Sequence, residues 1–342
     1  MRIHFPVIAI AVGAGGLLFA CTVTTTTNNN APGDDAGSVQ PVSDSSTTEP
    51  DTSTVTPGDD SGTDASDAAT VTPQAYVRIA HWSPDAPAAD VCFNTVGAAW
   101  TGQVPQLAQI VAAGDAGTLA DGGSAGITFP QVTSYLIIPP DSYEVRLVMA
   151  GSTDCSTSLV DLASVTLAAN SYTTIAAVGE AAPVATDQAL SLVPFTDEVS
   201  APAGQIALRF INAAPSMTLS PADLGTGSIA GTGGPFAPVF TGVAFGKTGG
   251  GSDAGAVDAN GYVAIIPLAT ATLSAHPSSA AADGPIAVND VTIAATSAAT
   301  VALVNGVSNG LPSGNAKLLQ CADVDDSAGA SLLSTCSIIS TQ

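Results

Sequence analysis

The stretch "SVTLAANSYTTIAAVG" (164–179) decides the fold, because "DVTIAATSAATVALVN" (290–305) repeats it further along the chain. "SLVPFTD" (191–197) is likewise matched by "KLLQCAD" (317–323), with the same spacing along the chain as the first pair. All four segments are short and rich in Val, Ile, Leu and Thr, and β-branched residues of this kind favour strands. The pattern predicts two copies of one strand-rich unit.

The repeat continues upstream in the same order. "YLIIP" (135–139) is matched by "VAIIP" (263–267), and "VRIAHWSP" (77–84) by "LRFINAAP" (208–215), which sets Arg78 opposite Arg209. No stretch keeps a helical apolar period over ten residues, and turns rich in Gly, Pro, Asn and Asp separate the strand-length runs. The sequence therefore predicts an all-β protein with two tandem antiparallel β-sandwich domains, at residues 75–198 and 204–342.

Residues 1–20 have the composition of a lipoprotein signal peptide. Arg2 supplies a positive charge, and the apolar run 5–20 is shorter than the roughly 20 residues that a membrane-spanning helix needs. The run ends in "LFAC" (18–21), which resembles the bacterial lipobox, where the cysteine receives diacylglycerol. The sequence predicts cleavage before Cys21 and attachment to the lipid bilayer through this acylated cysteine. The alternative is an ordinary secreted protein with a chance cysteine.

Segment 21–74 has the composition of a disordered tether. Beyond Cys21 it contains no Lys, Arg or aromatic residue, so it cannot bury enough apolar surface to offset the entropy of ordering. Its Asp pairs in "PGDDAG" and "PGDDSG" lack the spaced ligands of a calcium loop, so we expect no metal site there. Thr22, rather than Asp, follows Cys21, which by resemblance to Gram-negative sorting favours the outer membrane, facing the periplasm or the cell surface.

The charge balance disfavours anionic partners. The chain has 6 Lys and Arg against 29 Asp and Glu, for a formal net charge of −23. Such a surface repels the phosphates of nucleic acids, so we expect no nucleic-acid partner. Only 10% of the residues are charged, well below the roughly 25% of an ordinary globular protein. This composition fits an extracytoplasmic β-protein better than a helical enzyme.

Four further cysteines, an even number in an exported chain, predict disulfides. Cys92, Cys155, Cys321 and Cys336 allow three connectivities. We favour Cys92–Cys155 with Cys321–Cys336, because each bridge then stays within one predicted repeat. No CxxC motif or nearby histidine pair supports a zinc site, and we expect no cofactor.

The stretch "HWSPDAPAADV" (81–91) gathers a base, a nucleophile and two carboxylates in a chain poor in charge. Strand alternation places His81 on an inward face, Asp85 suits a turn, and Asp90 opens the next strand. We expect His81 and Asp90 to hold the turn together rather than to catalyse a reaction. In the second copy Asn212 replaces His81, and an amide cannot titrate. We therefore predict no catalytic residue.

Trp82 lies on the face opposite His81, beside the same turn. An exposed tryptophan next to Asp85 would be a contact for a sugar or a peptide. The alternative is a lid over the edge of the sandwich.

Three segments of the first copy carry a family resemblance: "VRIAHWSPDAPAADVCF", "FPQVTSYLIIPPDSYEVRLVMAG" and "VTLAANSYTTIAAVG". Together they resemble the bacterial extracytoplasmic family called domain of unknown function 4397, over residues 76 to about 197. Its members tend to open with V-R-x-x-H-x-S-P-D-A-P-x-V-D-V. The second copy departs from this opening, with "INAAPSM" in place of "AHWSPDA". The resemblance implies immunoglobulin-like repeats on an exported protein, and no known reaction.

These observations predict a non-enzymatic, membrane-anchored lipoprotein of the cell envelope. Two β-sandwich modules would serve a structural, adhesive or ligand-binding role, with an envelope protein or a polysaccharide as partner. A calcium-dependent or carbohydrate-binding surface module is the alternative, and a hydrolase that uses the His81 region is a further one.

Overall fold

Short segments rich in Val, Ile, Thr and Ala form strands throughout the body of the protein, because such side chains pack well on a pleated surface. The computed structural model describes residues 72–108, 126–184, 186–227, 235–249, 255–279, 286–295, 297–304, 316–324 and 333–339. All of them fall within one compact unit, Ala68–Gln342. The all-β prediction is confirmed. Among these residues no helix is long and apolar enough to cross a bilayer. The signal peptide 1–20, Cys21 and nearly all of the tether lie outside them.

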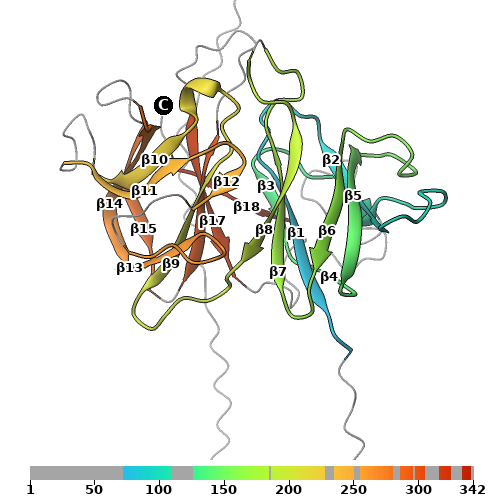
Figure 1. The fold of residues 1–342 in the computed structure, drawn as a ribbon, viewed down its shortest axis with the longest axis horizontal. Helices are drawn as coiled ribbons and strands as arrows, with labels where there is room; N and C mark the ends of the chain where they lie inside the picture. The colour runs from blue at the N-terminus through green and yellow to red at the C-terminus, as the bar shows by residue number, and fades with distance from the viewer. Residues whose placement is uncertain are drawn as a thin grey trace, which may run out of the picture. The chain divides into compact units, whose positions relative to one another are not determined.

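The first half of the body, Ala75–Asp197, contains two sheets that face each other (Figure 1). The larger sheet has the order β3-β1-β7-β8, with β4 also paired to β1, and the smaller sheet has the order β2-β5-β6. The strands are β1 (Ala75–His81), β2 (Ala89–Thr95), β3 (Gln131–Thr133), β4 (Leu136–Ile138), β5 (Asp141–Met149), β6 (Val160–Leu167), β7 (Tyr172–Val178) and β8 (Ser191–Asp197).

The second half, Ile206–Asp323, has the same strand order. Its larger sheet runs β12-β9-β16-β17, with β13 also paired to β9, and its smaller sheet runs β10-β14-β15 with the extra strand β11 on β10. The elements are β9 (Ile206–Asn212), the 3₁₀ turn η1 (Met217–Leu219), β10 (Ala222–Thr226), β11 (Ala237–Val243), β12 (Lys247–Thr248), β13 (Tyr262–Ile265), β14 (Leu268–Pro277), β15 (Ile286–Ile293), β16 (Ala298–Val304) and β17 (Lys317–Asp323).

One strand pair in each half departs from the predicted antiparallel arrangement. Strand β1 pairs with β7 in parallel, and β9 pairs with β16 in parallel. Parallel neighbours need a long crossover connection. Here the chain leaves β1 for β2 of the smaller sheet, adds β3 and β4 beside β1, passes through β5 and β6 of the smaller sheet and returns to β7 in the same direction as β1.

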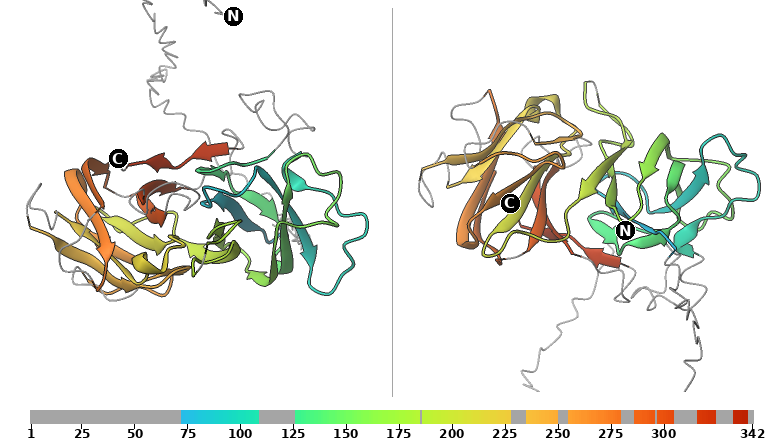
Figure 2. Two further views of the ribbon diagram at one scale, coloured as in Figure 1. Left: turned by 90° about the horizontal axis from the view of Figure 1, so that it is seen from above. Right: turned by 60° about the horizontal axis from the view of Figure 1, so that its bottom comes forward.

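The C-terminal segment links the two halves. Strand β18 (Leu333–Thr335) pairs with β3 of the first half, although its residues fall within the predicted second repeat (Figure 2). Strand β19 (Ser337–Ile338) pairs with β17 of the second half. The disulfide Cys321–Cys336 joins β17 to the residue between these two short strands, and a second disulfide joins Cys92 to Cys155. This is the pairing that the sequence favoured.

The three largest apolar clusters of the described residues stabilise the body. One lies inside each half, and the third lies between the two larger sheets. Because the larger sheets are covered on both faces, β9 and β16 are buried at every residue. The buried members of the core between the halves are Ala80, Trp82, Val132, Ala176, Val178, Phe195, Ile211, Ala213, Ala302, Val304, Leu319, Cys321 and Cys336.

Two buried salt bridges cross between the halves. Arg78 of β1 pairs through Nη2 with Oδ1 of Asp323 in β17. Arg209 of β9 pairs through Nη2 with Oδ1 of Asp197 in β8, at 2.5 Å. Each arginine also donates from Nη1 to the backbone carbonyl of the residue before its partner aspartate, at 2.8 Å. Each half therefore supplies one cation and one anion to the other half.

Hydroxyl groups satisfy the remaining carboxylate oxygens. In the first half, Oδ2 of Asp197 accepts hydrogen bonds from Thr174 at 2.5 Å and Tyr135 at 2.8 Å. The hydroxyl of Thr174 also accepts from Nε of Arg78, at 2.7 Å. The equivalent donors to Oδ2 of Asp323 are Thr300 at 2.6 Å and Tyr262 at 2.8 Å. We call these eight side chains, four from each half, the crossed ion network.

The network keeps its charges because they are mutually compensated. Burial alone lowers the pKa of a guanidinium, but the two nearby carboxylates outweigh burial and raise the pKa of Arg78 and of Arg209. Burial likewise raises the pKa of Asp197, and the two arginines overcome this effect and hold that pKa below its usual range. Two cations and two anions thus balance in a region closed to solvent.

The observed pairing moves one segment of the repeat by one residue. Matching "YLIIP" to "VAIIP" by sequence sets Tyr135 opposite Val263. In the structure it is Leu136 that occupies the place of Val263, since each pairs with the residue just before the network arginine. Tyr135 therefore corresponds to Tyr262, and both donate to a network aspartate.

Candidate functional site

The turn between β1 and β2 is a structural element of the first half. His81 is 1% exposed, and its Nε2 lies 3.1 Å from the carbonyl oxygen of Pro87. The carboxylate of Asp90 accepts hydrogen bonds from the backbone amides of Leu107 at 2.9 Å and Ala108 at 3.0 Å. His81 and Asp90 thus both hold backbone at this turn, each through its own hydrogen bonds and not through a bond to the other.

Asp85 joins this turn to the loop after β7. Its carboxylate accepts hydrogen bonds from the backbone amides of Ala181 and Ala182, both at 3.0 Å, and from the hydroxyl of Ser83 at 3.1 Å. The polar residues of the turn thus hold two loops in place.

Trp82 is not the exposed contact that alternation suggested. Its side chain is fully buried in the core between the halves. The alternation itself is correct, but the outer face of the first sandwich is covered by the second half, so Trp82 cannot meet a ligand there.

Because His81 is buried, the stability of the fold is expected to depend on pH. Burial is the main cause that lowers the pKa of His81 in the folded protein. Because the unfolded histidine, with a pKa of about 6.5, takes up a proton more readily, stability is complete above that pH and falls as the pH is lowered. Between pH 8 and 5 we expect the wild type to lose more stability than His81→Asn, with a difference of at most about 1.4 kcal/mol per pH unit.

Urea denaturation of both proteins at several pH values measures this difference. Asn212 at the equivalent strand position indicates that an amide fits there. Equal losses of stability in the two proteins would show that His81 titrates in the fold as it does in the unfolded chain.

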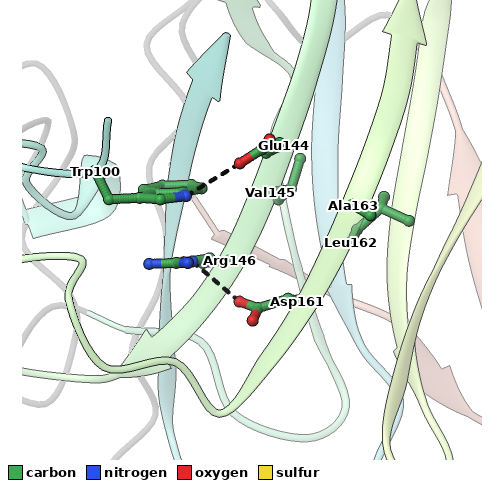
Figure 3. Close-up of a pocket in the computed structure, with 7 residues that line it drawn as sticks. All are labelled: Trp100, Glu144, Val145, Arg146, Asp161, Leu162 and Ala163. Carbon is green, nitrogen blue, oxygen red and sulfur yellow. Dashed lines mark hydrogen bonds and ion pairs between the residues drawn. The ribbon is translucent and has the colours of Figure 1, made fainter. Parts of the chain in front are cut away.

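The surface of the small sheet in the first half is hollowed around Trp100 and Arg146 (Figure 3). Arg146 projects from β5, and its guanidinium carbon lies 4.1 Å from the centre of the Trp100 ring. Nε of Arg146 is 3.1 Å from Oδ1 of Asp161 on β6, and Nη1 donates to the carbonyl of Cys155 at 3.0 Å. The guanidinium is thus fixed by one ring, one carboxylate and one carbonyl.

Glu144 fixes the Trp100 loop from the other side. Its carboxylate accepts hydrogen bonds from the indole Nε1 of Trp100 at 3.1 Å and from the backbone amide of Gly97 at 3.2 Å. Trp100 also packs against the small cluster that contains the Cys92–Cys155 disulfide. The stack of Trp100 on Arg146 is therefore preorganised.

Two hollows adjoin this stack. One of about 240 Å³ is lined by the stack together with Glu144, Val145, Asp161, Leu162 and Ala163. Another of about 490 Å³ is lined by the stack together with Thr101, Gly102, Asp154 and Ser156. We call Trp100, Glu144, Arg146 and Asp161 the Trp100 site. In volume and in mixed polarity the hollows approach a small-molecule site of roughly 300 to 1,000 Å³.

The sequence analysis did not identify the Trp100 site. A signal was present, since the chain contains only six Lys and Arg and two Trp, so an arginine on a strand close to a tryptophan loop is unusual. The contact itself depends on the β2–β5 register, in which Cys92 lies opposite Arg146. Among the described residues, no group of three or more His, Cys, Asp or Glu is placed to hold a metal ion.

Comparison with known proteins gives a family match for part of the chain and no activity. No curated protein matches the chain. Among solved structures, one described as a "putative cell adhesion protein" from Bacteroides fragilis aligns over 72% of this chain and 97% of its own, with 9% identity and a TM-score of 0.17. The family described as "Domain of unknown function (DUF4397)" matches residues 75–218, which cover the first half and extend through β9. Over residues 75–218 the chain is thus similar to the DUF4397 family.

Proposed function

We propose that the protein is a non-enzymatic lipoprotein of the cell envelope that displays a binding body on an N-terminal tether. The binding role rests on the difference between polar residues that are engaged inside the protein and those that border open hollows. His81, Asp85 and Asp90 are engaged in backbone contacts, and the crossed ion network is closed to solvent. The Trp100 site, by contrast, adjoins two solvent-accessible hollows.

The anchoring role rests on the N-terminal sequence. The "LFAC" motif (18–21) would place acyl chains on Cys21, and segment 21–74 would separate the body from the bilayer. Each buried methylene contributes about 0.8 kcal/mol, so several chains on one residue give durable attachment. We further propose the outer membrane as the location and an envelope protein or polysaccharide as the partner.

Cys21→Ala tests the anchor. We expect the wild type in the membrane fraction, with an intact mass that includes acyl chains on a mature chain beginning at Cys21. Cys21→Ala should move into the soluble fraction, because the only acylated residue is lost. Thr22→Ala serves as the control and should remain in the membrane. A wild-type protein without acyl mass, or a Cys21→Ala variant that stays membrane-bound, would refute the anchor.

A further inference from the structure

We infer that the Trp100 site binds a neutral saccharide; this inference rests on the proposed binding function and names its ligand class. The first argument comes from comparing the two halves. Strands β2 and β10 both begin with Ala-Asp, so their registers can be matched. Ser274 then occupies the place of Arg146, and Gly225 the place of Cys92.

The two halves therefore share the residues that the fold requires and differ at this site. The crossed ion network draws one Arg, Thr, Tyr and Asp from each half. The Trp100–Arg146 stack has no counterpart at the matched positions Ser274 and Gly225. In the second half the space beside Gly225 is filled by Phe236 and Ala237 at the start of β11. The sandwich can thus be built without the Trp100 site, so neither the strand order nor the crossed ion network requires it.

The charges around the hollows select against charged ligands. Three carboxylates, those of Glu144, Asp154 and Asp161, surround the single guanidinium of Arg146. An anionic ligand would face this excess of negative charge. A cationic ligand would have to compete with Arg146 for Asp161, while the guanidinium repels it. A neutral ligand meets neither penalty.

The lining fits a ring that carries both hydroxyl groups and C–H faces. Sugar hydroxyls can donate to the carboxylates of Glu144 and Asp161 and accept from the guanidinium of Arg146. The apolar C–H surface of the sugar can pack on Trp100 and on the exposed Ala163 of β6. Because the stack is held in place before binding, little ordering entropy is lost when a ligand enters.

The test is isothermal titration calorimetry on the full mature chain in detergent. The probes are β-1,4-linked hexamers of N-acetylglucosamine and of glucose, an anionic galacturonate hexamer and a pentalysine peptide. We expect at least one neutral hexamer to bind, and the pair distinguishes an N-acetylated wall-type sugar from a plain glucan. The galacturonate and pentalysine probes should not bind.

Variants locate the binding. Trp100→Ala should weaken binding of the neutral hexamer by about tenfold or more. Ala163→Trp, which fills the smaller hollow from exposed strand β6 without touching the disulfide cluster, should do the same even if Trp100→Ala folds poorly. Ala264→Trp, on an exposed position of β13 in the second half, is the matched control and should bind as the wild type does.

Three outcomes would overturn the inference: no neutral hexamer binds, a charged probe binds at the site instead, or the neutral hexamer binds equally to Ala163→Trp and Ala264→Trp. None of these outcomes changes the membrane fractionation of Cys21→Ala, so failure of the ligand assignment and failure of the anchor are distinguishable.

Discussion

Arg209→Met is expected to lower the free energy of unfolding by about 3–5 kcal/mol. The methionine removes the partner of Asp197 and leaves that carboxylate buried in the core between the halves. Arg78 also lies near Asp197, with Nε 3.7 Å from Oδ2, but its Nη2 is paired with Asp323, so one guanidinium would be left to balance two buried carboxylates. An uncompensated buried charge is far more destabilising than the loss of an ion pair in water. Urea denaturation followed by tryptophan fluorescence measures the change.

Arg146→Met is the matched control for this prediction. Arg146 also makes a salt bridge, with Asp161, but the two side chains are 23% and 54% exposed. Pairs of this kind contribute about 0–1 kcal/mol. If Arg209→Met were no more destabilising than Arg146→Met, the crossed ion network would not hold the halves together.

Trp82→Ala is the second substitution with a large expected effect, about 3–5 kcal/mol of lost stability. The side chain is fully buried among residues of both halves, and its removal leaves a cavity that the surrounding strands cannot close. Circular dichroism during urea denaturation measures the loss, since one of the two tryptophans that report by fluorescence is absent.

Trp100→Ala offers the comparison within the same chain. Trp100 is half-buried and covers only a small satellite cluster, so its removal should cost clearly less stability than that of Trp82. Its effect should appear in saccharide binding instead. Equal losses of stability, or a Trp82→Ala variant as stable as the wild type, would show that the core between the halves contributes little.

The repeat made much of this fold predictable from the sequence. Matching "VRIAHWSP" to "LRFINAAP" correctly set Arg78 opposite Arg209, and matching the last strands set Asp197 opposite Asp323. Apolar runs of strand length between turn residues indicated the all-β class. Each of these features can be recognised within short segments, or by comparing two short segments, so a single sequence reveals them.

The relation between the halves was not predictable in the same way. Alternation showed that Trp82 lies opposite His81, but not that a second sheet covers that face. Strand alternation alone places Arg78 on the outer face of the first sandwich, where it would meet solvent. In the structure the second half covers that face, so Arg78 is buried. Its partner Asp323 is 245 residues away, and no local pattern indicates such a contact.

Scanning calorimetry of the mature chain tests most directly the claim that the two halves share one interlocked core. The claim predicts a single transition, with calorimetric and van't Hoff enthalpies that agree. In Arg209→Met the whole transition should move to lower temperature. Two separate transitions in the wild type, or a shift of only one part of the heat absorption in Arg209→Met, would contradict it.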